Sequence, residues 1–489
     1  METLPELAAM EQCPDEVLLK VCRLLDFKSL ASFRLTTKRH ASIGAEALVS
    51  KVRFHCSQDS LQRLNALATH EVFRKNVETV VFEANILANI GCIHSYSAHY
   101  ELEHHRDERP QPPPRDATDR EKRLFERNLA KFQKEIENKY DRYRQVLNDQ
   151  QNLIKGTTYS ELLGPSIRRF PRLTKIELNT VGRCKHVLSE RFLETFAVDC
   201  AMPIEADTKH TKEQLKHLLF PHNRPLTNLH ELAVHVMSPK FFGGYMPRDM
   251  ICAAFSNLKV IELGLRLERD EVIAWGDMPA ESCYGDLRKG LLRDALCAAK
   301  GLEKLTINFE DYGYHGPCAD LKTVLGDNSW PKLHYLDLDC LSTTSDNLLA
   351  MLKRQPSIHT FKVGFVTLEQ GSWIEATRRM RKELNLAYFS AQGILEDSEQ
   401  MYPMHFIDSE AYVDSFVEMT MSDSLDVYVT SRYGSNEDDG DGDDDEDLHP
   451  LEHDDFGDPE ELRNDYGPFS DEDSELINDS DDSDMDCSG

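Results

Sequence analysis

The fold of this chain is decided by the stretch Pro331-Lys-Leu-His-Tyr-Leu-Asp-Leu338 and by its repetition. Leu336 and Leu338 alternate with polar residues, as in a short half-buried strand, and Leu333 turns the preceding chain inward. Similar phrases occupy residues 171–178, 228–234, 257–263, 301–307 and 356–363, and a degenerate one occupies 77–82. Each phrase therefore predicts a strand that follows a buried apolar residue.

Helical patterns separate the phrases, as at residues 188–198, 288–299 and 344–352. One helix and one strand in each repeated unit predict an α/β fold with a parallel-stranded solenoid. The units resemble leucine-rich repeats at irregular intervals, which implies a leucine-rich-repeat-like domain over residues 154–433. The alternative is an ordinary α/β domain whose helices and strands alternate without true repetition. Either sheet would offer a surface to a protein partner rather than a pocket for small-molecule chemistry.

A short helical module is predicted before the repeats, beginning at Pro14-Asp15-Glu16. Proline suits the first helical position, and acidic residues favour the positive end of the helix dipole. Apolar residues then follow at helical spacing: Val17, Leu18, Val21, Leu24 and Leu25. Asp26 and Phe27 end this helix, residues 28–35 predict a second, and Thr36 or Thr37 caps a third. A module of about forty residues cannot bury so wide a stripe by itself, so a partner is expected to cover part of it.

The module resembles an F-box over residues 13–50. That family places an apolar residue and a proline before an acidic pair, then spaced Leu, Ile or Val, then a helix with a basic pair. Lys38-Arg39 stands at the position of the basic pair. Cys13 replaces the usual leucine before the proline, and His40 stands where an aromatic residue is frequent. The alternative is a generic three-helix cap that binds nothing.

The resemblance implies a substrate-recognition subunit of an F-box cullin-RING ubiquitin ligase, itself without catalytic activity. The residues expected to bind the adaptor subunit of the ligase are Pro14, Val17, Leu18, Val21, Leu25, Leu30 and Phe33. The repeats would hold a protein substrate, and catalysis would come from proximity to a charged conjugating enzyme. The competing interpretation is a scaffold protein outside any ligase, whose acidic tail binds basic partners.

Residues 56–102 are expected to form a connecting helix and the degenerate first repeat. Residues 103–153 are expected to form a polar spacer stiffened by Pro110 and Pro112-Pro113-Pro114, and then a long amphipathic helix. Asp116, Thr118 or Asp119 is expected to cap this helix. Its apolar side contains Phe125, Leu129, Phe132, Ile136, Tyr140, Tyr143 and Leu147. A helix lying on the first repeat is favoured over a coiled-coil dimer, since the seam spans barely three heptads. The whole arrangement is similar to that of a large class of fungal F-box proteins.

Most of the negative charge lies in the last part of the chain. Residues 434–489 contain 25 acidic residues and one basic residue, so they contribute −24 to a net charge of −30. Such self-repulsion predicts a disordered tail, which either recruits a basic protein or acts as a solubilising extension. Glu437 begins a calcium-loop-like pattern, but the twelfth position is Leu448 instead of a bidentate glutamate. Direct nucleic-acid binding is not expected, because it needs clustered positive charge.

Candidate catalytic and metal-binding residues are few. The possible metal ligands near residue 100 are Cys92, His94, His99, His104 and His105. No two of these histidines have the i,i+4 spacing of a helical metal pair, so a solvated loop without metal is predicted. No phosphate-binding glycine loop or nucleophile motif is present, so neither a cofactor nor an enzyme activity is expected.

The sequence also predicts the protein's location and an N-terminal extension. The chain lacks an apolar run long enough to cross a bilayer, and residues 1–12 form an N-terminal extension without the basic flank of a signal peptide. The 12 cysteines include no Cys-x-x-Cys pair. Reduced thiols, no membrane contact and a cytoplasmic or nuclear location are therefore expected. The remaining predicted boundaries are 13–55 for the F-box and 434–489 for the tail.

Overall fold

The computed structural model describes residues 12–103, 109–156, 158–180, 204–205, 208–243, 246–266, 285–310, 319–399, 404–406 and 417–420. These residues belong to one compact unit, which runs to Gly434. The helix predicted at 188–198, the calcium-loop-like pattern and the acidic tail lie outside the described residues.

The N-terminal module consists of α2 (Asp15–Leu24), α3 (Phe27–Arg34) and α4 (Lys38–Val49). The Asp26 carboxylate accepts a hydrogen bond from the Ser29 amide at 2.8 Å, and Thr37 caps α4 by accepting from the His40 amide. Pro14 is the N-cap of α2 instead of its first helical residue, and its carbonyl accepts from the Val17 and Leu18 amides. The three predicted helices are therefore confirmed, with boundaries shifted by a residue or two.

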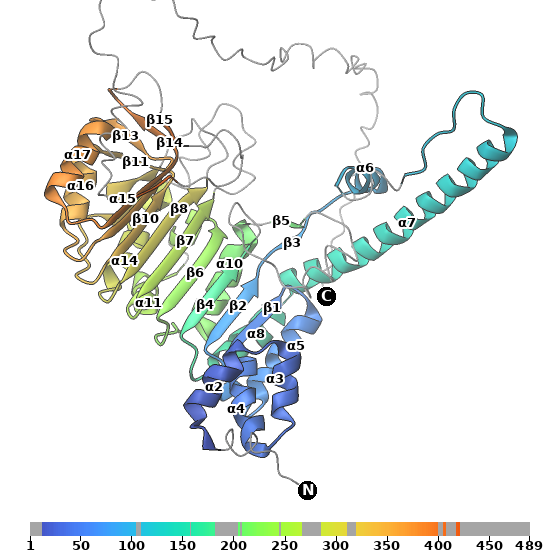
Figure 1. Ribbon diagram of the computed structural model, residues 1–489, viewed down its shortest axis with the longest axis horizontal. Coiled ribbons are helices and arrows are strands. Elements are labelled where there is room, and N and C mark those ends of the chain that lie inside the picture. Colours follow the sequence, from blue (N-terminus) through green and yellow to red (C-terminus); the bar gives the residue numbers. More distant parts are fainter. Residues whose placement is uncertain are drawn as a thin grey trace, which may run out of the picture. The chain divides into compact units, whose positions relative to one another are not determined.

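A long parallel sheet follows, in which the strands are paired in the order in which they occur in the chain (Figure 1). Its strands are β1 (Lys51–His55), β2 (Thr79–Glu83), β4 (Lys175–Asn179), β6 (Glu231–Met237), β7 (Val260–Arg266), β8 (Lys304–Glu310), β10 (Tyr335–Asp339), β12 (Thr360–Gly364) and β14 (Tyr388–Asp397). Every phrase identified in the sequence ends in one of these strands. The predicted α/β class is confirmed, whereas β1 and β14 were not anticipated.

One face of the sheet packs against helices. The helices with core residues are α5 (Gln58–Thr69), α8 (Thr158–Arg168), α10 (Thr208–Leu219), α11 (Arg248–Phe255), α14 (Leu291–Ala298), α15 (Leu321–Leu325), α16 (Ser345–Lys353) and α17 (Trp373–Glu383). The register aligns Leu305, Leu336 and Phe361 on neighbouring strands, and all three are buried in one core with these helices. Leu333 and its counterparts in the other phrases are buried there too, as predicted.

Shorter elements complete the sheet. A second parallel ladder contains β9 (Ala319–Asp320), β11 (Leu341–Thr344) and β13 (Thr367–Gln370), and β13 pairs with the end of β14. Strands β15 (Met404–Phe406) and β16 (Val417–Thr420) pair antiparallel with β14. The remaining short elements are β3 (Ile86–Leu87), β5 (Ile204–Glu205), η1 (Phe73–Lys75), η3 (Pro221–Asn223) and η4 (Pro239–Phe242).

The long predicted helix is α7 (Asp119–Lys155), capped by Thr118, and Thr118 and Glu121 form a reciprocal capping box. It packs against α6 (Ile93–Glu103) through a cluster separate from the main core, formed by Leu87, Tyr96, Tyr100, Phe132, Ile136, Tyr143 and Leu147. Only the C-terminal end of α7 reaches the main core, through Leu153. The prediction of a solvated loop across residues 93–103 is therefore wrong, because Tyr96 and Tyr100 bury one side of a helix there. None of the described helices combines the length and the apolarity that crossing a bilayer requires.

Candidate protein-binding surfaces

The predicted adaptor-binding residues divide into two groups in the folded module. Leu18, Leu30 and Phe33 are buried in the module's own core together with Cys22 and Ile43. Leu25 is half-buried and packs against that core. In this conformation these four residues support the module from within, and Pro14, Val17 and Val21 are the members of the predicted set that remain exposed.

Pro14, Val17, Val21 and Leu24 form an exposed apolar stripe along α2, here called the α2 surface. Val17 is 46% exposed, Val21 39% and Leu24 87%. Their spacing of three and four residues places them on one side of the helix. Leu24 was noted in the sequence stripe but omitted from the predicted binding set, although it extends the i, i+4, i+7 series of Val17 and Val21. Leu35, at the end of α3, is 88% exposed, and the sequence analysis did not identify it as a surface residue.

Arg39, the second residue of the basic pair, connects α4 to the start of α2. The Arg39 side chain donates from Nε to the Asp15 carboxylate at 2.8 Å and from Nη2 to the Cys13 carbonyl. His40 is buried with its ring 4.5 Å from the Phe33 ring, and its Nδ1 lies 2.7 Å from the Thr36 hydroxyl. His40 therefore packs against Phe33 as an aromatic residue would, while its Nε2 is buried without a hydrogen bond to any described residue.

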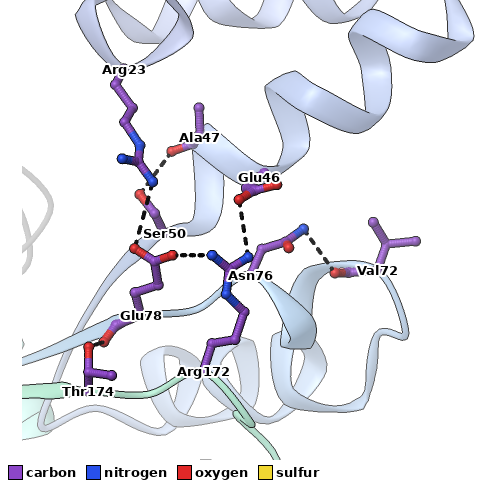
Figure 2. A network of polar contacts seen from close by, with 9 residues as sticks. All are labelled: Arg23, Glu46, Ala47, Ser50, Val72, Asn76, Glu78, Arg172 and Thr174. Atoms are coloured by element: carbon purple, nitrogen blue, oxygen red, sulfur yellow. Dashed lines mark hydrogen bonds and ion pairs between the residues drawn. The ribbon is translucent and has the colours of Figure 1, made fainter. Parts of the chain in front are cut away.

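A polar network joins the module to the sheet (Figure 2). Glu78, just before β2, contacts Arg23 of α2 at 3.7 Å and Arg172 at 2.6 Å, and Arg172 also contacts Glu46 of α4 at 3.1 Å. The amides of Glu78 and Thr79 both donate to the Ser50 carbonyl at 2.9 Å. The side chains are partly exposed, so each ion pair contributes little on its own. Together with the backbone bonds they hold α2 and α4 against the edge of the sheet.

The sheet face opposite the helices, here called the polar face, contains a second candidate surface. Its centre is formed by Lys304, Tyr335, Asp337, Lys362 and Tyr388, here called the lysine–tyrosine cluster. The Tyr335 hydroxyl donates to the Asp337 carboxylate at 3.1 Å. The ammonium groups of Lys304 and Lys362 lie 4.7 and 5.9 Å from the centre of the Tyr335 ring, and Lys362 lies 5.7 Å from that of Tyr388. Sequence patterns did not reveal this cluster, because its members come from four strands.

Burial changes the acidity of two groups in the cluster. Burial raises the pKa of the Asp337 carboxyl, and the Tyr335 hydroxyl and the ammonium groups of Lys362 and Lys304 oppose that rise. Burial, followed by the nearby Asp337 carboxylate, raises the pKa of the Tyr335 hydroxyl. Tyr335 therefore remains protonated and keeps donating to Asp337 at neutral pH.

The histidine-rich segment does not form a metal site within the described residues. Cys92 and His94 are exposed at the start of α6, and His104 and His105 lie outside the described residues. No three His, Cys, Asp or Glu side chains of the described part of the chain come together to hold a metal ion. The Cys92 thiol has a pKa lowered by hydrogen bonds from Ser95. The Cys56 thiol lies 4.0 Å from the His210 ring, is buried in the core, and has its pKa raised by burial to about 12.

Comparison with known proteins finds no family model that matches the chain and no curated protein that matches it. The function is therefore inferred from the α2 surface, the polar face and the way in which they are joined.

Proposed function

We propose that this chain is the substrate-recognition subunit of a cullin-RING ubiquitin ligase. In this proposal residues 13–55 act as an F-box that binds the adaptor subunit. The phrases of residues 154–433 form an irregular leucine-rich-repeat-like solenoid, and its polar face binds a protein substrate.

The observation that carries the proposal is the α2 surface, directly after Pro14 and two acidic residues. An exposed stripe of Val17, Val21 and Leu24 on so small a module is unusual for a surface in permanent contact with water. Covering a fully exposed apolar side chain contributes about 1.5–3 kcal/mol, and Val17 and Val21 would gain about half of that or less because they are already partly buried. Leu24 would gain most of it, so the three side chains together can anchor a complex. The basic pair supports the same proposal, because Arg39 fixes the start of α2 through Asp15.

The solenoid is supported by the order of the strands. The nine described strands of the long ladder, from β1 to β14, pair in parallel in chain order, and the leading apolar residue of each phrase is buried in one continuous core. Among the described residues, the helices with core residues pack on the other face, so none of them covers the polar face. A face of this kind suits the recognition of a protein rather than a small molecule.

The junction at Glu78 and Arg172 suits a proximity mechanism. A substrate on the polar face and an adaptor on α2 would be connected through a network with contacts of 2.6 to 3.7 Å. A fixed connection raises the effective concentration of the substrate near the conjugating enzyme, while this chain takes no part in bond formation.

The test is binding of a recombinant adaptor subunit to the full chain, measured by calorimetry. Val21→Asp combined with Leu24→Asp places two unpaired charges in the interface, which should weaken binding by a factor of about 100 or more. Both side chains are exposed in the free chain, so its fold should survive. Val72→Asp is the matched control, because Val72 is similarly exposed at 47% and lies outside the module. Undiminished binding by the double variant, or no binding by the wild type, would contradict the proposal and favour a scaffold role.

A further inference from the structure

Two buried hydroxyls, one in the lysine–tyrosine cluster and one beside it, lack hydrogen-bond partners among the described residues. The hydroxyls of Tyr388 and Ser390 are buried atoms that make no hydrogen bond with any described residue. Ser390 is 2% exposed and is in register with Lys362 on the neighbouring strand, so it shares the polar face with the cluster. A buried hydroxyl without a partner costs free energy, which a ligand that accepts its hydrogen bond would recover.

Lys304 provides a cation at the other side of the cluster. Its ammonium group lies over the Tyr335 ring and makes no ion pair within 4 Å among the described residues. The nearest carboxylate in the cluster, Asp337, already accepts from the Tyr335 hydroxyl. An incoming anion would therefore find Lys304 held in place by an aromatic ring and not by a competing ion pair.

The register of the strands fixes the distance between these donors. Lys304, Tyr335, Thr360 and Tyr388 form one row across β8, β10, β12 and β14. Strands in a sheet lie about 4.8 Å apart, so the row spans roughly 14 Å. An extended peptide covers that distance with about four or five residues.

We infer that the lysine–tyrosine cluster binds an extended acidic segment of a partner protein, with a carboxylate on Lys304 and acceptor groups on the Tyr388 and Ser390 hydroxyls. All three groups donate hydrogen bonds, so they complement a ligand rich in acceptors. The inference rests on the proposed function, since it names the class of substrate segment that the polar face would hold. Basic segments are disfavoured, because Lys304 and Lys362 already cover the tyrosine rings.

The test uses the full chain and three fluorescent decapeptides of alternating residues, Asp-Ser, Asn-Ser and Lys-Ser, followed by fluorescence anisotropy. The Asp-Ser peptide should bind at least tenfold more tightly than the other two, and added salt should weaken it. Lys304→Gln should weaken it about fivefold, the effect of one partly exposed charge pair. Tyr388→Phe should weaken it about threefold without lowering thermal stability, because the hydroxyl has no partner in the free chain. Lys332→Gln is the control, since Lys332 is exposed on the turn before β10.

Equal binding of the Asp-Ser and Asn-Ser peptides, unchanged binding by the Lys304 variant, or no peptide binding at all would each overturn the inference. Adaptor binding is measured on the same samples. A chain that binds the adaptor but not the acidic peptide refutes this inference alone, whereas loss of adaptor binding by the wild type refutes the proposed function.

Discussion

Gly264 gives the sharpest prediction about the sheet on which the proposed substrate surface depends. It lies within β7, where the pairing of β6 with β7 is irregular between Val234 and Met237. A Cβ atom built on Gly264 would lie 1.6 Å from the His235 carbonyl oxygen, less than half of an ordinary contact distance. The obstacle is backbone, so it cannot move aside by changing a rotamer.

Gly264→Ala must therefore push β6 and β7 apart locally and disturb backbone hydrogen bonds of the sheet. Overpacking costs about 1–3 kcal/mol and each lost buried hydrogen bond about 1–3 kcal/mol. We expect the free energy of unfolding to fall by about 3 kcal/mol or more, measured by urea denaturation of the full chain. The natural comparison is Gly301→Ala, where the added Cβ meets nothing within 4 Å.

Gly301→Ala should leave stability unchanged or raise it by up to about 1 kcal/mol, because alanine restricts the unfolded chain. Equal effects of the two substitutions would refute the reasoning, since they would show that the close approach of His235 to Gly264 does not exist in solution. The pair also separates a steric effect from the general effect of replacing glycine, which both variants share.

Two further predictions concern buried polar groups. The pKa of Asp337 is raised above its ordinary value of 3.8, so its contribution to stability is complete below the unfolded value and is lost as pH rises through the folded value. Asp337→Asn should therefore gain unfolding free energy relative to wild type as pH rises above about 4, and a constant difference across a urea–pH series would contradict this. Tyr143→Phe removes a hydroxyl that donates to the Ala88 carbonyl at 2.6 Å and accepts from the Ile90 amide at 2.7 Å, so trypsin should cleave α7 faster. Tyr140→Phe is the control, because it loses only a hydrogen bond of 3.5 Å to the Gly91 carbonyl. Equal cleavage of the two variants would show that the Tyr143 hydroxyl does not hold α7 in place.

Local features of the sequence determined the helices of the module, α7 and the repeated strands. Thr37 and Thr118 cap their helices, and each was one of the alternatives expected, because an N-cap acts on amides two or three residues away. Leu333, Leu336 and Leu338 are buried as expected, since alternation and a leading apolar residue describe one strand and its turn. These signals depend on residues that are close in the sequence, so the elements can be predicted without knowledge of the tertiary structure.

Tertiary structure alone decided which side chains meet. Leu18 is buried and Val17 is exposed because α4 covers one side of α2. The sequence of α2 alone does not show which of its apolar residues α4 will cover. Helix α6 exists because α7 provides a surface for Tyr96, in a segment whose own polarity suggested a loop. The lysine–tyrosine cluster likewise depends on the register of four strands distant in sequence. Contacts across such separations depend on packing and register, which no local pattern specifies.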